Sequence, residues 1–201
     1  MPDLMTIGYE GLTLADFLAI LRRVNVETLV DVRELPLSRK PGFSKSALSA
    51  AVTAREIQYV HVPALGCPPD IRHDYRNDGD WQRYTQRFCA YLDTQQDVIQ
   101  SLALRTRNER CCLLCFEADP AFCHRSYVAE RVRGVVGDSR AVVHLQATAQ
   151  ESWNADSRAG LGGKTRFTLR GRGSEMASTV RNFDIYDSAQ MVKSYSASSE
   201  T

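Results

Sequence analysis

One segment decides the fold of this chain: Cys111-Cys-Leu-Leu-Cys115-Phe-Glu117-Ala-Asp119-Pro120-Ala-Phe-Cys123-His124-Arg125-Ser126. The apolar run from Cys111 to Phe116 predicts a buried strand, and the polar turn after it leads into a helix expected over Pro120 to Arg133. Asp119 suits the N-cap and Pro120 the first helical position, because proline lacks an N–H that would have no partner there.

The predicted helix carries polar residues on the side that faces the sheet. Val128, Ala129 and Val132 mark its apolar stripe, and His124 and Arg125 share that stripe one turn earlier. This end of the helix lies near the carboxyl end of the preceding strand, which is where ligands bind in open α/β sheets. Free N–H groups and the positive end of the helix dipole favour an anion there.

The rest of the chain repeats the alternation of strand and helix. Strands are expected near residues 4–8, 28–33, 57–61 and 141–145, and helices near 14–21, 44–55 and 80–104. The segment from Pro63 to Gly79 is too long for an ordinary connection and is predicted to be a lid or binding loop. Such alternation predicts an α/β fold, a three-layer α/β/α sandwich with a mostly parallel, Rossmann-like sheet.

Composition bounds the class of protein. The 201 residues favour one domain over 1–149 and a Ser/Gly/Arg-rich tail over 150–201 that is flexible or loosely docked. A net charge of +1 argues against a wholly basic surface, so nucleic acid is only an alternative partner. No run approaches the roughly 18 apolar residues of a membrane span, and no export signal is visible. We therefore expect a cytoplasmic protein with reduced cysteines and no membrane partner, and leave its oligomeric state open.

A second polar cluster is expected beside the first. Strand alternation places Asp31 and Arg33 on one face at the carboxyl end of the 28–33 strand. The turn Tyr9-Glu10-Gly11 leaves the first strand at the same predicted edge of the sheet. The loop from Glu34 to Phe43 adds Ser38 and Arg39.

These motifs carry a resemblance to a known family. The residues involved are Thr6-Ile-Gly8-Tyr9-Glu10-Gly11, Asp31-Val-Arg33 with Pro36, Ser38-Arg39 and Gly42-Phe43, Tyr59-x-His61, Leu65-Gly66, and Leu114-Cys115-x-Glu117-x-Asp119-Pro120-x-x-Cys123-His124-Arg125. Over residues 4–145 the chain resembles the DUF488 family, a domain of unknown function. The resemblance implies a compact α/β domain of bacterial cytoplasmic type and implies no particular activity.

The leading hypothesis is an enzyme, a hydrolase or transferase, that acts on a phosphate-bearing or nucleoside-type ligand. Arginine binds phosphate or carboxylate through two parallel hydrogen bonds, and paired carboxylates supply acid and base. The expected ligand-binding residues are Gly8, Tyr9, Arg33, Ser38, Arg39, His124 and Arg125, and the expected acid/base residues are Glu10, Asp31 and Glu117. Two alternatives stay open: Arg125 pairs with Glu117 or Asp31 and only ties strand ends together, or the chain is a noncatalytic nucleotide- or nucleic-acid-binding module.

Sulfur chemistry is the third hypothesis. Cys123 is a candidate nucleophile because the start of a helix lowers a thiol pKa, although its predicted face also holds Tyr127 and Glu130 and so lies on the helix flank. Cys115 is a second candidate nucleophile. The sequence predicts no cofactor. As an alternative, Cys115, Cys123 and His124 form a metal-binding or redox set, and Cys67 or His73 from the lid would be further ligands. The C-x7-C-H spacing lacks the C-x2-C pairs of structural zinc sites.

Overall fold

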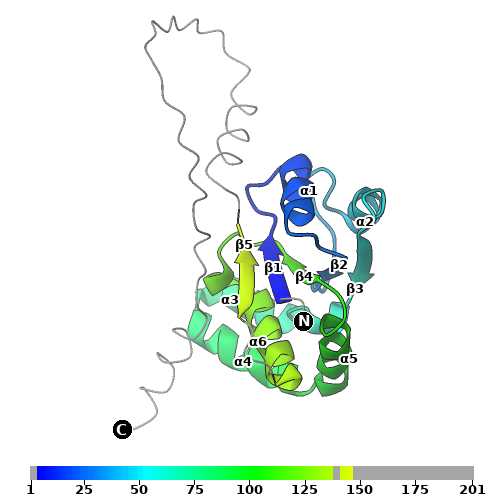
Figure 1. Ribbon diagram of the computed structural model, residues 1–201. Coiled ribbons are helices and arrows are strands. Elements are labelled where there is room, and N and C mark those ends of the chain that lie inside the picture. The colour runs from blue at the N-terminus through cyan, green and yellow to red at the C-terminus, as the bar shows by residue number, and fades with distance from the viewer. Residues whose placement is uncertain (1–3, 138–140, 147–201) are drawn as a thin grey trace, which may run out of the picture.

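The computed structural model describes residues 4–137 and 141–146. Its centre is a five-stranded sheet in the order β3-β2-β4-β1-β5, with every neighbouring pair parallel (Figure 1). The strands are β1 (Leu4–Gly8), β2 (Thr28–Asp31), β3 (Gln58–His61), β4 (Cys111–Cys115) and β5 (Val142–Leu145). The α/β class and the parallel sheet are therefore confirmed.

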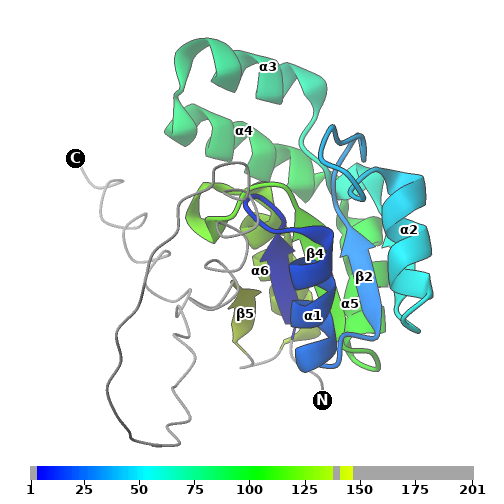
Figure 2. The same ribbon diagram turned by 90° about the horizontal axis from the view of Figure 1, so that it is seen from above.

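Helices connect the strands and cover both faces of the sheet. They are α1 (Leu14–Arg23), α2 (Lys45–Thr53), α3 (Pro69–Asp78), α4 (Trp81–Asp93), α5 (Gln96–Thr106) and α6 (His124–Val136), with short 3-10 turns η1 (Pro63–Leu65) and η2 (Pro120–Phe122). Leu29 and Leu114 pack in one core with α1 and α2, while Val30 and Leu113 pack in a second core with α4, α5 and α6. Figure 2 shows α1 on one side of the sheet and α6 on the other.

Strand β4 is the central strand, and its position brings distant segments together. All of its residues are buried, as expected for a parallel strand with neighbours on both sides. Cys115 stands opposite Gly8 of β1, and Leu114 stands opposite Asp31 of β2. The segments that follow β1, β2 and β4 consequently meet at one edge of the sheet.

The last helix begins later than the sequence predicts. Pro120–Phe122 form the 3-10 turn η2, and the Asp119 side chain accepts a hydrogen bond from the Ala121 N–H at its start. Cys123 is extended, with φ −135° and ψ 135°, and α6 starts only at His124. The predicted first helical turn is therefore wrong, because the capping signals at Asp119 and Pro120 serve a separate turn.

The expected lid over residues 63–79 is also wrong, because most of it is helix α3. This helix has a polar sequence in which Ile71 alone is buried, so it shows almost no apolar periodicity. Arg87 of α4 bonds Asp70 and Asp74 of α3, and these contacts fix the two helices side by side. The single helix predicted over 80–104 is likewise two helices, α4 and α5, separated at Thr94 and Gln95.

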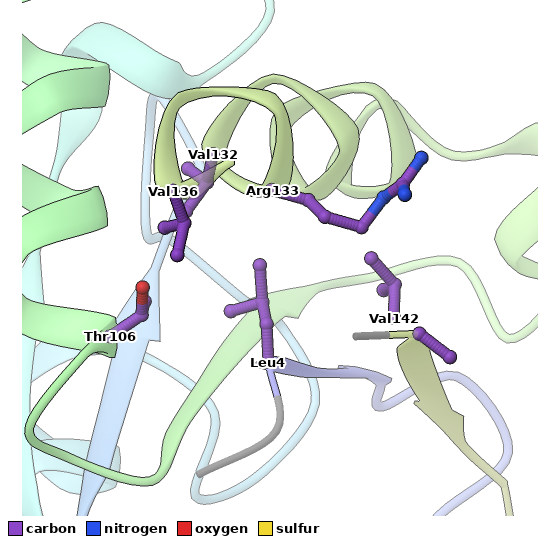
Figure 3. A pocket seen from close by; sticks show the side chains of 7 residues that line it. Leu4, Thr106, Val132, Arg133, Val136 and Val142 are labelled. Atoms are coloured by element: carbon purple, nitrogen blue, oxygen red, sulfur yellow. The ribbon is translucent and has the colours of Figure 1, made fainter. Parts of the chain in front are cut away.

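A small pocket lies at the opposite end of the sheet. Leu4, Val132 and Val136 line a small, mainly apolar pocket at the amino end of the strands (Figure 3). Among the described residues no helix is both long and apolar enough to cross a membrane. The tail expected over 150–201 and its boundary at residue 149 lie outside the described residues.

Replacing Gly8 by alanine tests how closely β1 approaches the segment after β4. A Cβ at Gly8 would overlap the backbone carbonyl of Glu117, so we expect Gly8→Ala to lower the free energy of unfolding by roughly 1–3 kcal/mol. The matched change Gly134→Ala places a Cβ in open space on α6 and should raise it by about 0.5–1 kcal/mol. Denaturant unfolding measures both, and equal effects would contradict the close approach.

Candidate functional site

The turn after β1 is joined to the segment after β4 through backbone hydrogen bonds. The Tyr9 N–H donates to the Cys115 carbonyl at 3.3 Å, and the Glu10 N–H donates to the Phe116 carbonyl at 2.8 Å. The Glu10 carboxylate accepts from the Ala118 N–H at 3.0 Å. Glu10 therefore fixes the position of the β4–α6 segment.

The loop after β2 joins the same edge through Tyr9. Arg33 Nη1 donates to the Tyr9 hydroxyl at 3.0 Å and to the Phe43 carbonyl at 2.9 Å. The rings of Tyr9 and Phe43 stack with their centroids 4.4 Å apart. Lys40 Nζ donates to the Tyr9 carbonyl at 2.9 Å. The three segments singled out in the sequence thus converge.

Asp31 and Arg33 form a buried ion pair within this network. Arg33 donates from Nε to Asp31 Oδ1 at 2.8 Å and from Nη2 to Oδ2 at 2.5 Å. The Tyr59 hydroxyl also donates to Oδ2, at 2.6 Å, and burial together with this bond raises the pKa of Tyr59. The Asp31 side chain is fully buried, so its carboxylate is occupied by groups of the protein itself.

Arg125 is fully buried and binds the backbone of the turn before α6. Its Nη1 donates to the Glu117 carbonyl at 2.5 Å and its Nη2 to the Ala118 carbonyl at 3.0 Å. Its Nε donates to the Thr6 hydroxyl of β1 at 3.3 Å. The guanidinium therefore links β1 to the β4–α6 turn. Its partners in this turn are backbone carbonyl oxygens, whereas the alternative drawn from the sequence expected the carboxylate of Glu117 or Asp31.

Four donor groups gather on the α4/α6 side of this turn. Sγ of Cys115 lies 2.9 Å from Oε2 of Glu117 and 3.5 Å from Nδ1 of His124. Sγ of Cys123 lies 3.0 Å from the same Oε2. The four donor atoms all lie within 4.8 Å of one another. We call Cys115, Glu117, Cys123 and His124 the sulfur cluster.

The orientation of His124 is fixed by a strand that lies outside the cluster. Its Nε2 is 3.0 Å from the carbonyl oxygen of Val32, directly after β2. A carbonyl oxygen only accepts hydrogen bonds, so Nε2 carries a proton and Nδ1 faces the two sulfurs. Metal-binding histidines are usually held by such a bond at the second ring nitrogen.

Burial and the contacts among the four residues shift their pKa values. Burial alone raises the pKa of Cys123, but hydrogen bonds with Cys115 and His124 outweigh burial and bring this pKa well below its usual range. Burial lowers the pKa of His124, and the bond with Cys123 raises it overall. Burial raises the pKa values of Cys115 and Glu117. Cys123 is consequently the sulfur of the cluster that loses its proton most readily.

Several other expected site residues lie outside the sulfur cluster. Arg39 is exposed, and the Ser38 hydroxyl accepts a hydrogen bond from the Lys40 N–H in the loop after β2. Cys67 belongs to the apolar core, and His73 is exposed on α3 beside Asp74. The sequence placed Glu117 among acid/base residues and not in the metal set. Glu117 follows Cys115 by two residues, so strand alternation places both side chains on the same face. This signal could have added Glu117 to the metal set.

These observations define a class: an α/β protein whose parallel sheet carries a cysteine–histidine–carboxylate cluster where its central strand ends. The chain belongs to the DUF488 family, whose family model, described as "Domain of unknown function DUF488", matches residues 13–132. The matched range contains the whole sulfur cluster and the Asp31–Arg33 pair, while the turn after β1 precedes it. Comparisons with curated proteins and with solved structures give no match.

Arg125→Lys tests the role of the buried guanidinium. Lysine cannot present the planar fork that reaches two carbonyls, so at least one of them loses its partner to this buried side chain. We expect the free energy of unfolding to fall by roughly 2–4 kcal/mol. Arg131→Lys on the exposed side of the same helix should change it by less than about 0.5 kcal/mol. Similar losses in both variants would exclude a special role for Arg125.

Proposed function

We propose that the chain binds one thiophilic divalent metal ion, with Zn²⁺ as the leading candidate, in the sulfur cluster. The observation that carries this proposal is that two cysteine sulfurs, one imidazole nitrogen and one carboxylate oxygen lie within 4.8 Å of one another. All four residue types are zinc ligands, and four donors complete a tetrahedral site.

The spacing of the donors suits such an ion. Tetrahedral zinc with Zn–S near 2.3 Å and Zn–N or Zn–O near 2.0 Å separates its ligand atoms by roughly 3.3–3.8 Å. The distance of 3.5 Å between Cys115 Sγ and His124 Nδ1 already falls in this range. The two sulfur–oxygen distances, 2.9 and 3.0 Å, need only a small outward shift of Glu117.

The chemistry of the ligands favours zinc over the harder cations. Two sulfur ligands select against Mg²⁺ and Ca²⁺, which prefer oxygen donors. Cys115, Cys123 and His124 are buried, whereas Glu117 is only partly buried. Glu117 is therefore the ligand through which solvent or a further molecule would approach the ion.

The sequence hypothesis of an enzyme for a phosphate-bearing or nucleoside-type ligand stays a prediction, as does the nucleotide- or nucleic-acid-binding module. The contacts of Arg33 and Arg125 weigh against both, because these guanidinium groups donate to groups of the protein itself. Arg39 alone of the three arginines is exposed. The metal ion proposed here is the alternative that the sequence offered beside a protein without a cofactor.

Metal content of the full chain tests the proposal. We expect one zinc ion per chain, and we expect Cys115→Ser and Cys123→Ser to weaken zinc binding by more than the roughly 10–100-fold caused by losing an outer-shell partner. Cys89→Ser makes the same chemical change on α4, outside the cluster, and should leave zinc binding unchanged. Elemental analysis and competition with a chelator measure these values. Zinc bound equally by all three variants would reject the site.

Zinc affinity should also rise with pH. Burial raises the pKa of Cys115 well above its usual range, so this thiol holds a proton that a metal ion must displace. Each proton released tightens the apparent affinity about tenfold per pH unit. Chelator competition between about pH 6 and pH 8 measures the slope. An affinity independent of pH across this range would contradict thiolate ligation.

A further inference from the structure

The two sulfurs of the cluster lie next to each other as well as next to their other partners. Sγ of Cys115 and Sγ of Cys123 approach the same carboxylate oxygen, Oε2 of Glu117, at 2.9 and 3.0 Å. We propose that Cys115 and Cys123 form a dithiol that hydroperoxide oxidises to a disulfide, and that this oxidation releases the metal ion. Metal release rests on the proposed function, whereas disulfide formation rests on the cysteine pair alone.

The fold brings the two cysteines together across the turn between β4 and α6. Cys115 ends β4, and Cys123 is the extended residue before α6. Their sulfurs lie within 4.8 Å of each other, and a disulfide bond requires them to approach to about 2.05 Å.

No other pair among the six cysteines is placed in this way. Cys111 and Cys112 are neighbours on β4, but they project to opposite faces of the sheet and lie in different cores. Cys67 lies in the apolar core, and Cys89 is half-buried on α4. All six are in the described part of the chain, so the structure selects Cys115 and Cys123.

Oxidation of the pair by hydrogen peroxide is a balanced two-electron reaction. The sulfur of Cys123 attacks one peroxide oxygen, the O–O bond breaks, and the departing oxygen leaves as water with a proton. The sulfur of Cys115 then attacks the sulfenic acid sulfur of Cys123, the S–O bond breaks, and a second water leaves with the thiol proton. Two thiols and one peroxide give one disulfide and two waters, the sulfurs being oxidised and the peroxide reduced.

Access to the pair favours a small oxidant. The exposed fraction is 3% for Cys115 and 1% for Cys123, whereas Glu117 beside them is partly exposed. Exposed fractions this small hinder a bulky aromatic thiol reagent much more than a molecule close to the size of water. The folded, reduced chain should therefore react with hydrogen peroxide at this pair while these two thiols resist the bulky reagent.

Oxidation would dismantle the metal site. A disulfide removes both sulfur ligands and leaves only Glu117 and His124 as donors, too few to hold a buried zinc ion. The cluster would thus alternate between a reduced, metal-binding form and an oxidised form without metal. Reduction of the disulfide by a dithiol would restore the first form.

The experiment treats the reduced full-length chain with hydrogen peroxide, in zinc-loaded and in zinc-free form. Cleavage after Arg110, Glu117 and Arg125 gives fragments 111–117 and 118–125, and Cys123 is the single cysteine of the second fragment. We expect mass spectrometry to find these fragments joined through Cys115 and Cys123, and a chromophoric chelator to detect zinc as the disulfide forms. Cys89→Ser should behave as the parent, and Cys115→Ser and Cys123→Ser should give no joined fragments.

Disulfide formation and metal release are contradicted by different results. Oxidation of Cys123 to sulfinic or sulfonic acid without joined fragments, or joining through Cys111 or Cys112, would overturn the dithiol. Disulfide formation in a chain that never binds zinc would refute the proposed metal function and leave the dithiol standing. Zinc binding without any disulfide would refute the dithiol and leave the proposed metal function standing. The peptide map of the unmutated chain decides the dithiol even where a variant fails to fold.

Discussion

The attachment of the first turn of α6 to three strands is the constraint on which the rest of the structure depends. Arg125 is a buried cation held by backbone carbonyls after β4 and by Thr6 of β1, and His124 reaches the Val32 carbonyl after β2. Two adjacent residues therefore fix the end of β4 relative to both of its neighbours. A buried guanidinium needs such partners, and supplying them determines the path of the turn that carries Glu117 and Cys123.

The same sheet edge carries two polar networks of different character. Asp31, Arg33, Tyr9 and Tyr59 form a network beside the core of α1 and α2, in which the ion pair is saturated by its own neighbours. The sulfur cluster lies on the other side, next to α4 and α6. Polar side chains whose hydrogen bonds all go to other groups of the protein stabilise the structure, but they have few donors left to bind a ligand. The sulfur cluster instead gathers four donors of the types that hold metal ions.

Local pattern was enough to predict the framework of this fold. The apolar run of β1, the Thr13 cap of α1 and the alternation along β2 are all found, since each signal comes from neighbouring residues. Helix α3 was missed because it buries only Ile71 and depends on bonds from Arg87 of another helix. Convergence of the three polar segments was predicted, because carboxyl ends of parallel strands share one edge. The grouping of Glu117 with both cysteines was not predicted.

A single extended residue explains why that grouping escaped prediction. In a helix that began at Pro120, Cys123 would share a flank with Tyr127 and Glu130 and would not meet Glu117. The sequence signals of Asp119 and Pro120 are satisfied equally by an α-helix and by the 3-10 turn that the structure contains. Contacts distant in the sequence hold the observed arrangement, because His124 at the start of α6 reaches the Val32 carbonyl and Arg125 reaches the Thr6 hydroxyl. Cys123 is the extended residue directly before this helix, and its sulfur approaches the same Glu117 oxygen as the sulfur of Cys115.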